Sequence, residues 1–77
     1  MRNFHGKTIK LMSPVSPACI YVHVKMWTEH NHSQIWANHE NVFDGDALIA
    51  YKIFDETVKN ICEEATKDNL KYEVSKM

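Results

Sequence analysis

Residues 18–43, ACIYVHVKMWTEHNHSQIWANHENVF, contain two alternating segments joined by a short polar loop. The first segment, residues 18–27, alternates in the way that one strand of a half-buried sheet does. One face of this strand carries Ile20, Val22, Val24 and Met26. The other face carries Cys19, Tyr21, His23, Lys25 and Trp27. The second segment, residues 33–43, is predicted to return as the antiparallel partner strand.

The pairing of these two strands determines which side chains share a face. We expect Met26 to lie opposite Ala37 across the EHNHS loop, which places Trp27 opposite Trp36 on the face away from the core. A slip of one residue would turn every apolar side chain to the wrong face, so the apolar pattern favours this pairing.

The segments around this hairpin complete a small α+β domain. Residues 7–12 form a short alternating strand, SPVSP at 13–17 is a connector, and residues 69–77 form a last strand. Between them a long helix is predicted from Asp44 to about Lys67. We therefore expect a single two-layer domain over residues 1–77 in the order β-β-β-α-β. An antiparallel sheet of three or four strands would have one long helix on one face.

Apolar residues at three- and four-residue spacing carry the helix prediction. The stripe is formed by Ala47, Ala50, Tyr51, Phe54, Val58, Ile61, Cys62 and Ala65. Asp44 or Asp46 can cap its start, since aspartate accepts hydrogen bonds from free backbone N–H groups. Asp68 and Asn69 are expected to end it, because asparagine tolerates the left-handed backbone that follows many helices.

Composition excludes several functional classes. The 77 residues are 44% hydrophobic and 25% charged, with no apolar run long enough for a membrane span. The N-terminus does not resemble a signal peptide, so we expect a soluble, cytoplasmic protein. Cys19 and Cys62 are expected to be small buried side chains rather than a disulfide. We find no phosphate-binding glycine loop, nucleophile motif or C-x-x-C pair, and therefore expect no enzyme and no cofactor.

Two surfaces are candidates for binding a larger protein or protein complex. The first is the aromatic sheet face with Tyr21, Trp27 and Trp36, since exposed aromatic patches are typical of interfaces, including those of homodimers. The alternative interpretation is that the two tryptophans only stabilise their hairpin. The second surface is the acidic side of the helix, with Asp55, Glu56 and Glu63, which could oppose a basic groove.

Two further hypotheses concern other ligands. His30, His32 and His39 could hold a metal ion such as zinc, although their spacing matches no zinc signature and we expect no metal site. The aromatic face could instead stack the bases of single-stranded nucleic acid, flanked by Lys7, Lys10 and Lys25. Because the chain has only one arginine, Arg2, a nucleic-acid partner is not expected.

In length, element order and acidic second half, the chain is similar to small single-domain proteins of phages and other mobile elements. Residues 40–68 hold eight acidic residues against three lysines. Those phage proteins occlude host defence or transcription machinery, so the resemblance implies a non-enzymatic inhibitor of a larger host complex. It covers general architecture alone and places no functional residue on this sequence.

Overall fold

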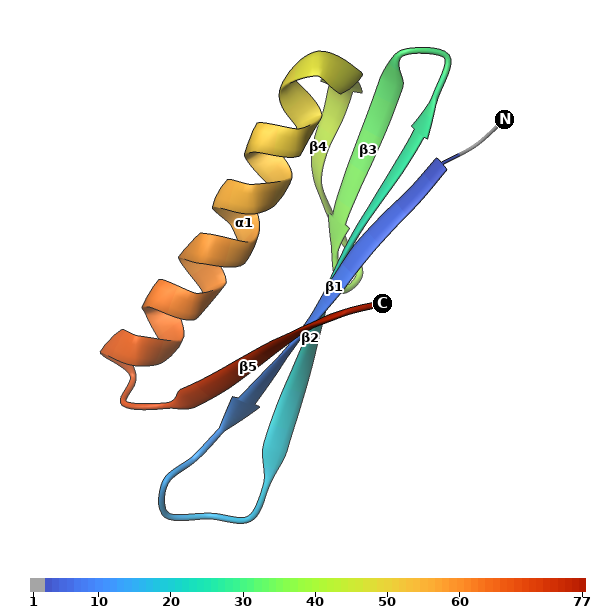
Figure 1. Ribbon diagram of the computed structural model, residues 1–77. Coiled ribbons are helices and arrows are strands. Elements are labelled where there is room, and N and C mark those ends of the chain that lie inside the picture. The colour runs from blue at the N-terminus through green and yellow to red at the C-terminus, as the bar shows by residue number, and fades with distance from the viewer. Residues whose placement is uncertain (1–2) are drawn as a thin grey trace.

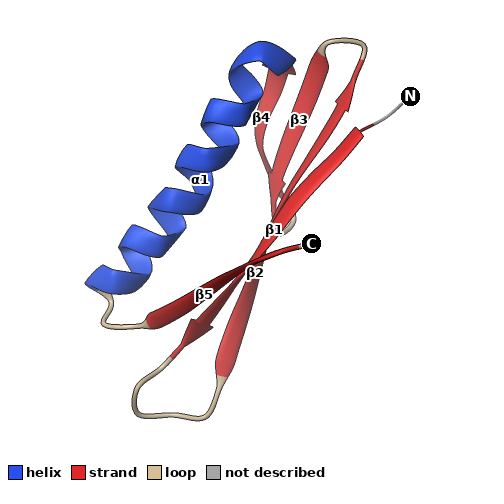
Figure 2. Ribbon diagram, viewed as in Figure 1, coloured by secondary structure: helices blue, strands red, loops and turns tan. Residues whose placement is uncertain are grey.

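The computed structural model describes residues 3–77, which form one antiparallel sheet and one helix (Figures 1 and 2). The elements in chain order are β1 (Asn3–Met12), β2 (Cys19–Glu29), β3 (His32–Ala37), β4 (Glu40–Asp46), α1 (Ala47–Lys67) and β5 (Lys71–Lys76). The strand order across the sheet is β4-β3-β2-β1-β5. The α+β class with one helix on one face of the sheet is confirmed.

Helix α1 runs along one face of the sheet (Figure 1), and the core lies between the two layers. The buried apolar cluster of this core comes from β1, β2, β3 and α1 and consists of Ile9, Val24, Met26, Ile35, Ala50, Phe54 and Val58. Among the described residues, 3–77, no helix is both long and apolar enough to cross a membrane.

The sheet has five strands where the sequence predicted three or four, because the segment at 33–43 is divided. Asn38 and His39 form a two-residue turn between Ala37 of β3 and Glu40 of β4, which lie opposite each other. Asn38 adopts a left-handed backbone with φ 55°, a conformation that asparagine tolerates better than most residues. What reads as one long strand is therefore a second hairpin.

The expected pairing of β2 and β3 is wrong by two residues. Met26 lies opposite Ile35 instead of Ala37, since the loop contains only His30 and Asn31. Both turn residues have positive φ, 52° and 63°, the requirement of a type I′ hairpin turn. A shift of two keeps every side chain on its predicted face.

Both ends of α1 are capped by local hydrogen bonds. Asp46 caps the start, because its side chain accepts a hydrogen bond of 2.7 Å from the backbone N–H of Leu48. At the other end, the N–H of Leu70 donates to the carbonyl of Ala65 over 2.8 Å, and Asn69 is left-handed with φ 60°. This is a Schellman motif, in which a left-handed residue follows the last turn.

The β1–β2 hairpin extends past the end of α1, so its tip has no helix over it (Figure 1). Ile20, predicted to lie on the core face, is consequently 64% exposed. Cys19 is also exposed rather than buried, because it begins β2 on the opposite face of this extension. Cys62 on α1 is partly buried and also unbridged, and its burial raises the pKa of its thiol.

Candidate protein-binding face

The face of the sheet opposite α1 is here called the outer face. Alternation along each strand and the pairing registers determine its members. Its large side chains include Phe4, Tyr21, Lys25, Trp27, His32, Gln34 and Trp36. No element among residues 3–77 packs across this face, since the one helix lies on the other side (Figure 1).

The aromatic centre of the outer face is a pair of rings on neighbouring strands. Phe4 of β1 lies opposite Trp27 of β2, with ring centroids 5.3 Å apart and planes inclined by 54°. Gly6 lets the Phe4 ring lie close to the backbone, because a Cβ there would come within 2.9 Å of Phe4 Cζ and of Met77 Sδ. Phe4 remains 48% exposed, so the pair presents apolar area to solvent.

The three predicted aromatic residues share the outer face but do not form one cluster. Trp36 lies opposite Lys25 and Trp27 lies opposite Gln34, so the two tryptophans are diagonal neighbours instead of a direct pair. Tyr21 is on β2 but precedes Trp27 by roughly 20 Å along the extended strand. The structure thus brings Trp27 and Trp36 together, adds Phe4, and leaves Tyr21 towards the β1–β2 tip.

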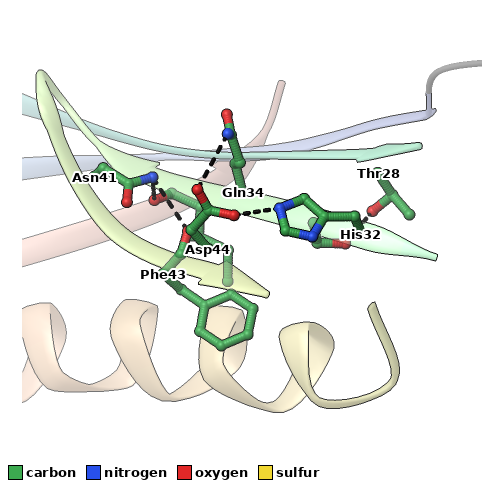
Figure 3. Close-up of polar contacts among 8 residues, drawn as sticks. Thr28, His32, Gln34, Asn41, Phe43 and Asp44 are labelled. Atoms are coloured by element: carbon green, nitrogen blue, oxygen red, sulfur yellow. Dashed lines mark hydrogen bonds and ion pairs between the residues drawn. The ribbon is translucent and has the colours of Figure 1, made fainter. Parts of the chain in front are cut away.

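Beside Trp27 the outer face is hollowed. This shallow depression of about 350 Å³ is lined by Trp27, Glu29, His30, His32 and Gln34. The carboxylate of Asp44 on β4 bonds to His32 Nε2, and Gln34 Nε2 donates to its second oxygen over 3.3 Å (Figure 3). These contacts hold the polar wall of the depression in place next to its aromatic wall, a combination typical of small recognition sites.

The three histidines of the metal hypothesis lie apart. His30 is in the β2–β3 turn, where its Nε2 is 3.6 Å from Glu29, and His32 faces Asp44. His39 is in the turn at the far end of β3, roughly 17 Å along the strand from His32. Within residues 3–77 no group of three histidine, cysteine or acidic side chains is arranged to hold a metal ion.

The acidic candidates lie on the other layer. Asp55 and Glu56 are exposed on α1. The Oε1 atom of Glu63 lies 3.9 Å from Nζ of Lys59, which is one turn earlier on the helix. The lysine partly neutralises the acidic surface, although such exposed pairs add little stability. Because this surface and the outer face point in opposite directions (Figure 1), one flat partner cannot contact both.

The lysines proposed to flank a bound nucleic acid are also divided. Lys10 and Lys25 lie on the outer face, whereas Lys7 pairs with Val24 and therefore faces the helix layer. Glu73 of β5 lies opposite Lys10 on the outer face, so the positive charge there is balanced. A continuous basic track, which a phosphate backbone requires, is not formed by these residues.

Phe4 and the depression beside Trp27 are the features that the sequence did not predict. Phe4 belongs to β1, which begins at Asn3 instead of Lys7. The alternation of Phe4, Gly6 and Thr8 with His5, Lys7 and Ile9 is the signal that could have extended the strand.

Comparison with models of protein families, with curated proteins and with solved structures gives no match for this chain. The outer face must therefore be interpreted from its own geometry.

Proposed function

We propose that the protein is a non-enzymatic binding module whose outer face docks onto a larger protein. The observation that carries this proposal is the aromatic group of Phe4, Trp27 and Trp36 on the sheet face that α1 does not cover. A sheet face meeting only water is ordinarily polar, and aromatic side chains are enriched at the centres of protein interfaces.

The geometry favours recognition over mere stabilisation of the hairpin. A Trp–Trp pair that only stabilised β2 and β3 would lie directly opposite, where cross-strand pairs interact most strongly. Between β2 and β3, however, each tryptophan lies opposite a polar residue, Gln34 or Lys25, and Phe4 and Tyr21 remain 48% and 50% exposed on the same face. Covering such rings would contribute favourable free energy to association, since each aromatic side chain can bury about 150–250 Å².

The depression lined by Trp27 and Gln34 adds directional contacts to the apolar ones. An interface combines a buried apolar centre with a polar rim, and here Glu29, His32 and Asp44 form that rim. A partner with an apolar side chain flanked by hydrogen-bond donors would fit both walls. The more specific expectation, inhibition of a host complex by occlusion, rests on the general sequence profile alone.

The test is affinity capture with matched baits. The wild-type chain, a Trp27→Ser/Trp36→Ser variant and an Asp55→Asn/Glu56→Gln variant would each be immobilised after circular dichroism shows that they fold. The proposal predicts one stoichiometric protein that the wild type and the helix variant retain and the tryptophan variant loses. Retention by the tryptophan variant with loss by the helix variant would overturn it.

Because Trp27 and Trp36 are partly buried, a second variant separates binding from folding. Tyr21 is 50% exposed at the edge of the same face, so Tyr21→Ser should leave the core intact. If the tryptophan variant fails to fold, Phe4→Ser takes its place, since Phe4 is 48% exposed. Undiminished capture by a folded Phe4→Ser/Tyr21→Ser bait would also contradict docking on this face.

A further inference from the structure

The two edges of the sheet differ in how they are protected. The β4 edge carries acidic side chains, Glu40, Asp44 and Asp46, and its register with β3 is broken by an irregularity at Ile35/Trp36. Charges and bulges of this kind prevent edge strands from pairing with other chains. The β5 edge also carries charged side chains, Lys71, Glu73 and Lys76, but it has no bulge, because β5 pairs regularly with β1; all six of its residues are exposed.

The hydrogen bonds of β5 show which backbone groups are open. The N–H of Met77 donates to the carbonyl of Gly6 over 3.0 Å, which makes these two residues a hydrogen-bonded pair in the β1–β5 register. Such pairs alternate along an antiparallel ladder, so every second residue of β5 bonds to β1. The N–H and C=O groups of Tyr72, Val74 and Lys76 therefore point to the open edge.

We propose that this edge pairs with β5 of a second copy of the chain, antiparallel about Val74. In that register Val74 faces Val74 of the second copy and Tyr72 faces its Lys76. The open N–H and C=O groups of Tyr72, Val74 and Lys76 are then all hydrogen-bonded between the two strands. Glu73 then faces Ser75, so no like charges lie opposite each other. Moving the register by two residues towards the start of β5 would place Glu73 against Glu73, which is unfavourable.

The side chains beside the edge support the same occupant. Tyr72 and Val74 are 45% and 43% exposed on the helix side, although they are apolar residues of a regular strand. Next to them, between α1 and β5, lies a groove of about 480 Å³ lined by Lys59, Cys62, Glu63, Thr66, Lys67 and Tyr72. Because Tyr72 lines this groove, a second copy paired along β5 would cover part of the exposed apolar area on the helix side of the edge.

The resulting dimer is a ten-stranded sheet. A two-fold axis that relates antiparallel edge strands is perpendicular to the sheet, so both helices lie on one side and both outer faces on the other. The dimer would leave Trp27 and Trp36 uncovered and present the outer face twice. It is therefore a separate interface from the one in the proposed function.

The first test compares two matched lysine substitutions. Val74 on β5 and Val42 on the opposite edge are both 43% exposed, so lysine is tolerated at each without disturbing the core. Analytical ultracentrifugation over a dilution series should show a dimer for the wild type and for Val42→Lys. In Val74→Lys two ammonium groups would meet at the axis and weaken the dimer at least about tenfold.

A cysteine placed at the axis tests the register itself. Hydrogen-bonded residues opposite each other have Cα atoms about 5.5 Å apart, within the range that a disulfide spans. In a background in which Cys19 and Cys62 are replaced by serine, Val74→Cys should form a covalent dimer on mild oxidation. Tyr72→Cys should not, because Tyr72 would be roughly 14 Å from its own copy across the axis.

A wild-type mass equal to one chain up to the highest soluble concentration would overturn the proposal. So would a dimer that survives Val74→Lys but is lost in Trp27→Ser/Trp36→Ser, since that result would place the dimer contact on the outer face. Oxidation that cross-links Tyr72→Cys as readily as Val74→Cys would contradict the register.

Discussion

Phe54 and Tyr51 are two aromatic residues one turn apart on α1, and both of their rings lie near His5. The Phe54 ring centroid is 4.8 Å from that of His5, and the Tyr51 centroid is 6.2 Å from it. Phe54 is 0% exposed, whereas Tyr51 is 54% exposed. Both rings lie near His5, but only Phe54 is buried. Comparing Phe54→Ala with Tyr51→Ala therefore separates the contribution of burial to the free energy of unfolding from that of the contact with His5.

Burial sets the expected losses. A fully buried phenylalanine removes about 150–250 Å² from water, and at about 25 cal/mol per Å² its loss agrees with the roughly 3–5 kcal/mol found for such truncations. About half of that area is involved at Tyr51, so Tyr51→Ala should cost at most about 2 kcal/mol. A chain of this length has roughly 4–12 kcal/mol in total, so Phe54→Ala removes much of the free energy of unfolding.

Urea denaturation followed by circular dichroism measures both losses. Phe54→Leu, which keeps most of the volume and should cost about 1–2 kcal/mol, provides a folded variant if Phe54→Ala does not fold. Equal losses for Phe54→Ala and Tyr51→Ala would refute the placement of α1 on the sheet, because the buried face of the helix would then include both residues.

Four further predictions concern the helix cap, the β2–β3 turn and the cysteines. Asp46→Ala should lower the free energy of unfolding by about 1 kcal/mol, or about 4–8 °C in Tm, and Asp46→Asn should retain most of it, as calorimetry would show. Replacing His30 and Asn31 with Asn and Gly should raise stability by about 1 kcal/mol in urea denaturation, because glycine and asparagine tolerate positive φ; a loss would contradict the type I′ turn. At mildly alkaline pH, iodoacetamide should modify Cys19 faster than Cys62 by peptide mass mapping, since burial raises the pKa of the Cys62 thiol and only the thiolate reacts. Faster labelling of Cys62 than of Cys19 would refute the burial of Cys62. Because the folded protein binds the Cys62 proton more tightly than the unfolded chain does, the free energy of unfolding should fall as the pH rises past the pKa of the unfolded thiol.

The alternating and helical patterns were sufficient to predict the fold class and the faces. Val24 and Met26 were assigned to the core and Trp27 to the outer face, and the two-residue error in register changed none of these because side chains repeat every two residues. The sequence predicts that either Asp44 or Asp46 caps the start of the helix. The hydrogen bond from the backbone N–H of Leu48 identifies Asp46 as the cap.

The remaining errors have physical causes. The β2–β3 turn and the β3–β4 turn both lack glycine. The left-handed residues His30 and Asn38 therefore gave no local signal for a two-residue turn. Periodicity also cannot show where a covering layer ends, which is why Ile20 was expected in the core. The aromatic centre of the outer face was incomplete without Phe4, since its strand begins before the first clear alternation.

Photocrosslinking tests docking on the outer face most directly. A benzophenone amino acid would replace Trp36 on the outer face in one bait and Glu56 on the exposed side of α1 in another, each checked for folding. If the outer face binds a larger protein, the position 36 bait forms one discrete heavier adduct in a native lysate and the position 56 bait does not. The same adduct from position 56, with none from position 36, would show that the partner contacts the helix layer and that docking on the outer face is wrong.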